Sequence, residues 1–225
     1  FTDISIVQKP GNTRKGYTTL YQFGRKDAFP GTDVIPNGSF TKDAGDHMSI
    51  TNSIQNPQNF YTWGNSWKGI PPTGYTYYNL WSAGNTTTSY NNNTVIKTVY
   101  DPSPAGFKMP ASNAFTGFTG SGENSNGVDI KVDDTRNLDK FKNNFGHNFW
   151  TNNSHILTIF FPSSGKRGDV SGKLEYNTGD HSGYCWMAIP NAFDMGNSIY
   201  FDWNSVMPKT YLYRPTGTPI HPVSE

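Results

Sequence analysis

Residues 198–203 read SIYFDW, and their alternation of side-chain types predicts a β-strand with one buried face. Ile199 and Phe201 lie on one side of this strand, whereas Tyr200 and Asp202 lie on the other. We expect the apolar side to face the core and the polar side to face solvent.

Further segments combine β-branched and aromatic residues in the manner of strands. The run at 154–161 (SHILTIFF) is the most apolar of them, so we expect it to be a buried central strand. The others are 17–23 (YTTLYQF), 94–100 (TVIKTVY) and the closing segment 219–223.

Helical periodicity is confined to the middle of the chain. Residues 134–145 place Leu138, Phe141 and Phe145 on one face, which predicts an amphipathic helix. A second, shorter helix is expected over residues 110–118, with its two phenylalanines facing inward.

The composition favours short strands joined by long, ordered loops. Glycine (23 residues) and proline (15 residues) form turns, while aromatic residues, 15% of the chain, supply apolar area that disordered chains lack. Residues 31–95 show no regular periodicity, and no repeat or interdomain linker divides the sequence. We therefore expect a single α+β domain over residues 1–225, with short antiparallel strands and two helices.

The net charge of +1 gives no electrostatic footprint for nucleic acid or for an anionic membrane. The chain also lacks the ~18 consecutive apolar residues that a membrane-spanning helix needs. We therefore expect no nucleic-acid partner and no direct insertion of this domain into a membrane.

Titratable side chains are scattered along the sequence. The histidines form no i, i+4 pair, and one cysteine cannot build a zinc cluster. We therefore expect no catalytic residue, no metal and no cofactor. The nearest approaches to paired catalytic groups are Asp43 with Asp46, Asp133 with Asp134, and Asp180 with His181.

Two short motifs invite a functional interpretation. Cys185 has His181 nearby, but aromatic residues on both sides of the thiol favour a buried strand and inert packing over a nucleophile. Residues 167–169 (RGD) match a tripeptide of integrin ligands, although a turn accounts for this match equally well.

Aromatic residues gather in the C-terminal segment 183–225, beside Asn, Asp and Ser. Tyrosine and tryptophan provide a large contact area at low entropic cost, and their flat faces also stack on sugar rings. The segment is therefore where we expect ligand recognition. Its aromatic residues include Tyr184, Trp186, Phe193, Tyr200, Trp203, Tyr211 and Tyr213.

Seven short motifs occur in a fixed order along nearly the whole chain. They are YQFGRKDAFPG (21–31), NLW (79–81), YDPSPAGFKMP (100–110), FP with SGKR (161–167), GKL (172–174), GYCWMA (183–188) and RPTGTPIHPV (214–223). This series resembles Bacteroidetes surface-protein domains related to the Fibrobacter succinogenes major paralogous domain. The resemblance implies a C-type-lectin-like fold, in the C-terminal part of a larger lipoprotein or at the tip of a fimbria, on the outer-membrane cell surface.

The chain departs from this family at several positions. Ser103 and Pro222 stand where members often carry cysteines, which suggests the loss of a pair, and His221 replaces an expected arginine. In some lectin-fold proteins this C-terminal segment is diversified by retroelements, and the substitutions here fit such diversification.

Two activities found on the same fold lack their residues here. Formylglycine-generating enzymes use a pair of cysteines with copper, whereas this chain has one cysteine. Calcium-dependent lectins pair Trp-Asn-Asp with a second tripeptide, whereas this chain has Trp203-Asn204-Ser205 and no partner for it. The resemblance therefore implies neither activity.

We interpret the chain as an extracellular, adhesin-type binding domain and not as an enzyme. Its expected partners are a host or microbial surface protein or glycan, and other fimbrial subunits. The expected scaffold residues are Trp186, Phe201, Arg214 and Gly217. The expected ligand contacts are Met187, Tyr200, Asp202, Trp203, Tyr211 and Tyr213.

Two alternatives stay open at this point. A structural or assembly module of a fimbria would contact another subunit and need no ligand pocket. A glycan-active hydrolase would need two carboxylates facing each other across a cleft, ~5 to 10 Å apart.

Overall fold

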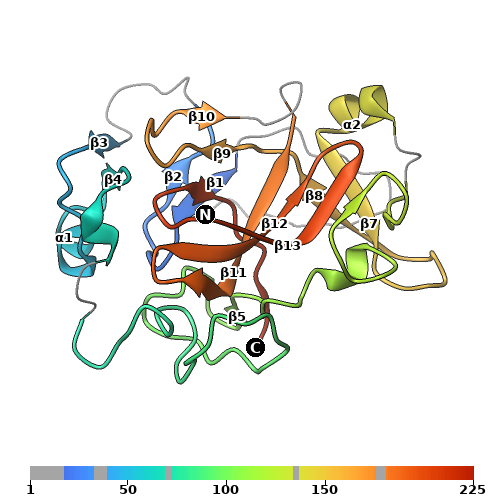
Figure 1. The fold of residues 1–225 in the computed structure, drawn as a ribbon. Coiled ribbons are helices and arrows are strands. Elements are labelled where there is room, and N and C mark those ends of the chain that lie inside the picture. Colours follow the sequence, from blue (N-terminus) through green and yellow to red (C-terminus); the bar gives the residue numbers. More distant parts are fainter. Residues whose placement is uncertain (1–17, 33–39, 69–71, 134–136, 176–180) are drawn as a thin grey trace, which may run out of the picture.

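The computed structural model describes residues 18–32, 40–68, 72–133, 137–175 and 181–225 of the chain (Figure 1). Most of the regular elements in these residues are strands, and only two short α-helices form within them. The architecture is therefore α+β, with short strands and long connections. No helix in the described ranges is long and apolar enough to cross a membrane.

An antiparallel sheet built mainly from the C-terminal segment runs through the middle of the fold (Figure 1). Its strands, in spatial order, are β11 (Gly183–Ala192), β12 (Met195–Phe201), β13 (Ser205–Tyr213) and β6 (Ser125–Asn126). The strand predicted at 198–203 is confirmed over residues 198–201, because β12 ends at Phe201. Within it, Tyr200 lies opposite Tyr184 on the neighbouring strand.

β11 is buried on both of its faces. Cys185 and Met187 belong to one hydrophobic core, whereas Trp186 and Ala188 belong to another. Successive side chains of a strand point to opposite faces, so each face of β11 meets its own core. Such a strand is an almost continuous apolar run and does not alternate with polar residues.

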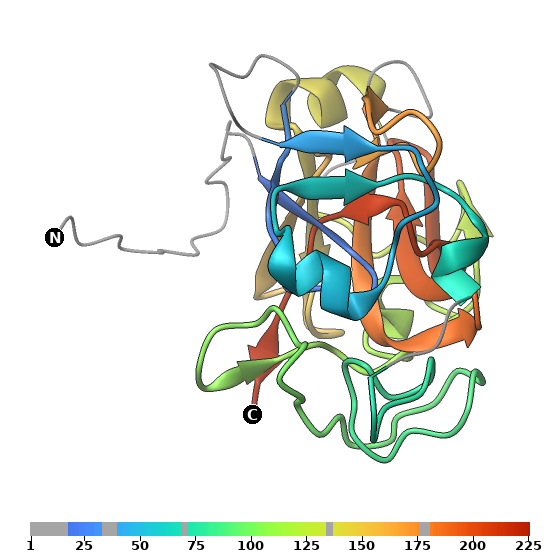
Figure 2. The same ribbon diagram turned by 90° about the vertical axis from the view of Figure 1, so that its left-hand side faces the viewer.

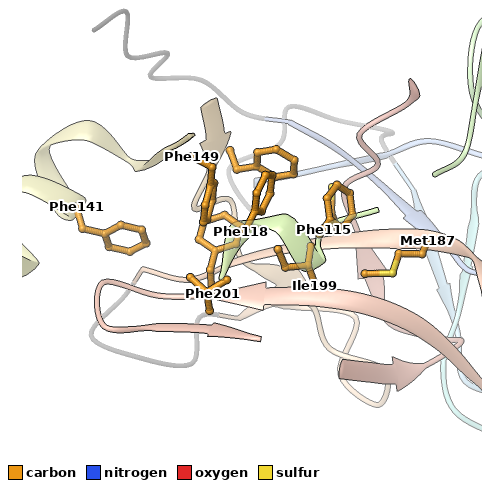
Figure 3. Close-up of a cluster of buried hydrophobic side chains, with 10 residues drawn as sticks. Phe115, Phe118, Phe141, Phe149, Met187, Ile199 and Phe201 are labelled. Atoms are coloured by element: carbon orange, nitrogen blue, oxygen red, sulfur yellow. The ribbon is translucent and has the colours of Figure 1, made fainter. Parts of the chain in front are cut away.

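The first core is built largely from phenylalanine rings (Figure 3). Phe118 and Phe149 stack with their centroids 4.1 Å apart, and Phe149 meets Phe201 edge-on at 5.5 Å. Both arrangements are favoured by the charge distribution of aromatic rings. The buried members are Phe115, Phe118, Phe141, Phe149, Phe161, Cys185, Met187, Ile199, Phe201 and Val206.

Trp186 anchors the second core. Its ring meets Phe23 edge-on at 5.5 Å, and its indole N–H donates to the Tyr21 carbonyl at 2.7 Å. The other buried members are Trp81, Val95, Met109, Ala188 and Ile189. A third, smaller core contains Met48, Ile50, Tyr61, Trp67 and Leu80.

The strand predicted at 17–23 is confirmed over β1 (Thr19–Gln22), which lies in a sheet of order β10-β9-β14-β1-β2. In Figure 2 the β5–β15 pair lies beside the C-terminus, away from the parallel pair β3–β4. The predicted closing strand at 219–223 forms only at its last residue, in β15. The remaining strands are β2 (Phe29–Pro30), β3 (Thr41–Asp43), β4 (Asn59–Tyr61), β5 (Phe107–Lys108), β7 (Gly146–Trp150), β8 (Thr158–Pro162), β9 (Lys166–Arg167), β10 (Leu174–Glu175), β14 (Gly217–Thr218) and β15 (Val223–Ser224).

Two strand predictions are wrong. Residues 94–100 form no strand, and Lys97 makes only an isolated bridge. Residues 154–161 do not form a buried central strand, because β8 pairs only with β7 and because Ile156 and Leu157 are 69% and 58% exposed. These two side chains lie where the β7–β8 hairpin turns, so their apolar character did not lead to burial.

The helix predicted at 134–145 is confirmed over α2 (Leu138–Asn144), which buries Phe141 in the first core. Asn137 begins it by accepting a backbone N–H of the first turn. Phe145 ends it in the left-handed conformation, with a φ of 56°. The first three residues of the predicted range lie outside the described residues.

The second predicted helix, at 110–118, forms only as the 3-10 turn η2 (Thr116–Phe118). Phe115 and Phe118 are nevertheless buried, as predicted, because the first core holds both rings. Two helical segments formed where none was predicted, α1 (Ile50–Gln55) and η1 (Asn65–Lys68).

The first core should be sensitive to loss of the Phe201 ring. We expect Phe201→Ala to lower the free energy of unfolding by about 3–5 kcal/mol, because the ring is fully buried among other rings. Urea unfolding measures this loss. Phe107→Ala, at a ring that is 45% exposed, is the matched control and should change stability by less than about 0.5 kcal/mol. Equal losses in both variants would contradict the described core.

Candidate ligand-binding surface

Three aromatic side chains lie exposed around the end of β13. Tyr211 and Tyr213 are 54% and 41% exposed, and Trp63, from the segment after β4, is 37% exposed. The rings of Trp63 and Tyr213 are in contact, with centroids 4.5 Å apart and planes at 58°. We call these three residues the aromatic surface.

Each segment that carries the aromatic surface is held by a neighbouring segment. On β12, Asn197 lies opposite Tyr211 and Met195 lies opposite Tyr213. The N–H of Trp63 donates to the Asp169 carbonyl at 2.7 Å. The exposed rings are therefore mounted on fixed segments, which lowers the entropic cost of binding through them.

Tyr90 supports the same strand. Its hydroxyl donates to the Thr210 carbonyl at 2.6 Å, and its ring packs against the first core. Burial raises the pKa of the Tyr90 phenol, and nearby Tyr211 adds to this effect. Tyr90 therefore remains neutral and acts as a hydrogen-bond donor at physiological pH.

Arg214 follows the aromatic surface in sequence and points into the protein. Its guanidinium is buried, donates to the carbonyls of Tyr77 (2.7 Å) and Ala192 (3.3 Å), and lies 5.0 Å from the centre of the Phe23 ring. Burial lowers the pKa of Arg214 to about 9, while Tyr77 and Asp194 oppose this shift. Arg214 therefore joins two segments of the backbone from inside the protein.

The other predicted scaffold residues are also internal. Trp186 and Phe201 are fully buried in the second and first cores. Gly217 is buried against Arg167, and a β-carbon at this glycine would lie 3.1 Å from the Phe60 ring. A larger residue at 217 would therefore push against two packed side chains.

Two predicted ligand contacts need correction because they are not surface residues. Met187 is completely buried in the first core, since both faces of β11 are covered. Trp203 is half-buried and packs against the same core, the inward direction that simple alternation would give it.

Asp202 also needs correction as an exposed contact. It is buried, and its Oδ1 accepts the N–H groups of Asn204 and Ser205, both at 2.8 Å. Its Oδ2 accepts the Tyr200 hydroxyl at 2.6 Å. Asp202 therefore shapes the turn between β12 and β13, and half-buried Tyr200 is tied to that turn.

No family model, curated protein or solved structure matches the chain. The C-type-lectin-like fold therefore stays a prediction from the sequence motifs.

The RGD tripeptide is not displayed as a recognition motif. Arg167 is fully buried and donates to the carbonyls of Pro30, Thr32 and Gly172, at distances of 2.9, 2.7 and 2.7 Å. A buried guanidinium cannot contact a partner protein. Its role is to hold three connections of the chain together.

Candidate acid–base pairs are engaged in loop structure where they are described. The carboxylate Oδ1 of Asp43 lies 3.1 Å from Nδ1 of His47. The Asp46 carboxylate accepts the Ser66 N–H at 2.6 Å, and this hydrogen bond lowers the pKa of Asp46. Within the described ranges, no three His, Cys, Asp or Glu side chains are grouped so as to hold a metal. Asp134 and Asp180 lie outside those ranges.

Sequence reasoning missed Trp63 as part of the aromatic surface. It lies within residues 31–95, which show no periodicity, and meets Tyr213 only through the tertiary fold. Its one local signal is the aromatic run around it at 60–63 (FYTW).

The Cys185 thiol should be inert in the folded protein. It is buried in the first core, and burial raises the pKa of the thiol, so the reactive thiolate is disfavoured. We expect an aromatic disulfide reagent to label the native chain at least ~100-fold more slowly than the urea-unfolded chain at mildly alkaline pH. Similar rates would place Cys185 at the surface and reopen its role as a nucleophile.

Asp202 should contribute to stability through the turn that it caps. We expect Asp202→Ala to lower the free energy of unfolding by about 1–3 kcal/mol, because two N–H groups lose their acceptor. Tyr200→Phe removes only the hydroxyl and should cost about 1 kcal/mol. Unchanged stability of Asp202→Ala, together with lost ligand binding, would restore Asp202 as a contact.

Proposed function

We propose that this chain is an extracellular ligand-binding domain of the adhesin type. The observation that supports this proposal most directly is the aromatic surface, three exposed rings mounted on fixed backbone. Large rings of this kind are costly to leave in water and gain free energy when a partner covers them. Tyrosine and tryptophan are also the residues that most often dominate binding energy at protein interfaces.

The sequence motifs support a place for this domain on the bacterial cell surface or at a fimbrial tip. The partner in that setting is a host or microbial surface protein or glycan. Exposed aromatic rings suit either class, since they stack on sugar rings and also fill pockets of a protein partner. The substitutions in the C-terminal segment agree with a surface that varies between members of such a family.

The aromatic surface should be needed for binding and dispensable for folding. We expect the double variant Trp63→Ala, Tyr213→Ala to lose about 30-fold in affinity, because truncating central aromatic residues typically costs ~2 kcal/mol or more. A glycan array and a pull-down from cell-surface extracts, each run with wild type and variant, measure the loss.

Phe107→Ala is the matched control, since it removes an exposed ring from β5. It should bind like the wild type, and urea unfolding should show that all three proteins have similar stability. A ligand captured equally by the wild type and the double variant would contradict this proposal.

A further inference from the structure

The outer edge of β13 is paired over only part of its length. β6 pairs with Ser205 and Val206, and within the described ranges no other strand joins this edge. Farther along, the side-chain amide of Asn124 takes the place of a strand. It accepts the Lys209 N–H at 3.0 Å and donates to the Lys209 carbonyl at 2.9 Å.

Hydrogen bonds at Lys209 and at Arg214 fix the direction of the backbone groups that lie between these two residues. The N–H and C=O of Lys209 point to the outer edge, toward Asn124. The N–H of Arg214 points the other way, toward Asp194 in the turn just before β12. Backbone groups alternate in an antiparallel strand, so those of Tyr211 and Tyr213 point outward like those of Lys209.

Three of these outward groups lack a partner among the residues that the structure describes. The Tyr213 carbonyl accepts the N–H of Thr216, whereas no group within the described ranges bonds to the Tyr213 N–H or to the N–H and C=O of Tyr211. Asn124 bounds this stretch at one end, and Trp63, against Tyr213, bounds it at the other. The result is a short open edge of two donors and one acceptor beside the aromatic surface.

We propose that this edge binds an extended peptide segment of a partner protein as an added strand. This inference rests on the proposed function and names the ligand class for the same surface. The peptide backbone pairs with Tyr211 and Tyr213, and its side chains contact the exposed rings of Tyr211, Tyr213 and Trp63. Strand addition of this kind takes affinity from the main chain and specificity from the pockets for alternate side chains.

Two features favour a peptide over a glycan. An open edge presents donors and acceptors at the spacing of a polypeptide backbone, and Asn124 already satisfies the neighbouring Lys209 with a peptide-like amide. The rings of Trp63 and Tyr213 are inclined at 58° and do not form one flat platform for a sugar. Because the two rings are in contact, a side chain of the peptide packs against their exposed faces.

A phage-displayed library of random linear peptides, selected on the whole chain, tests this inference. Selected peptides are then N-methylated at one position at a time. We expect one sensitive position, where methylation of the N–H that faces the Tyr211 carbonyl weakens binding at least about tenfold, while the adjacent positions tolerate it. This scan uses wild-type protein, so it is independent of how any variant folds.

A pair of variants at one position separates backbone from side chain. Tyr211→Ala keeps the N–H and loses the ring, whereas Tyr211→Pro loses both, and proline is tolerated at strand edges. We expect the proline variant to bind selected peptides about tenfold more weakly than the alanine variant does.

Other outcomes would overturn the inference. They are a library that yields no binder, peptides indifferent to N-methylation, or equal binding by Tyr211→Ala and Tyr211→Pro. Glycan binding that requires Trp63 and Tyr213, without any peptide binding, would overturn the inference while leaving the proposed function in place. If the Trp63→Ala, Tyr213→Ala double variant still bound every glycan and protein ligand of the wild type, the proposed function itself would be contradicted.

Discussion

Burial of β11 on every side is the constraint on which the rest of the fold depends. Its two faces meet different cores, and one edge pairs with β12. At the other edge, the N–H of Trp186 donates to Pro219 at 3.0 Å and the N–H of Ala188 donates to Pro110 at 2.9 Å. Proline offers a carbonyl without an N–H. These segments therefore accept hydrogen bonds from the N–H groups of β11 without adding another regular strand to the sheet. Parts of the chain distant in sequence are therefore fixed relative to one strand.

Long connections around such a strand need hydrogen-bond donors for their carbonyl groups. Three buried arginines, Arg25, Arg167 and Arg214, supply several of them. A guanidinium has five N–H groups in a fixed plane and no acceptor, so one side chain can bridge several carbonyls at once. This explains how a chain rich in glycine and proline forms ordered loops with few helices. It also explains why the RGD tripeptide, a plausible surface motif in sequence, is structural.

Local periodicity was a good guide where one face of an element is buried and a poor guide elsewhere. Alternation correctly predicted burial of Ile199 and Phe201, and helical spacing correctly predicted burial of Phe141. Met187 was wrongly expected at the surface, because the segments that cover its face of β11 lie far away in sequence. Trp63 was missed for the same reason, since its contact with Tyr213 exists only in the folded chain. Two of the three residues of the aromatic surface, Tyr211 and Tyr213, were therefore predictable from the sequence, and Trp63 was not.

A β-bulge in β13 determines to which face of the sheet Tyr211 and Tyr213 point. Phe201 lies opposite Val206, and Asn197 lies opposite Tyr211, although the register shifts by one residue between these pairs. The extra residue on β13 reverses its alternation, so Tyr211 points to the same side as Val206. That side is packed near Val206 and open near Tyr211. The first residues of β13 therefore contribute to the core, and its last residues contribute to the surface. Substitution at the open end can therefore change the exposed surface while the buried end continues to hold the fold.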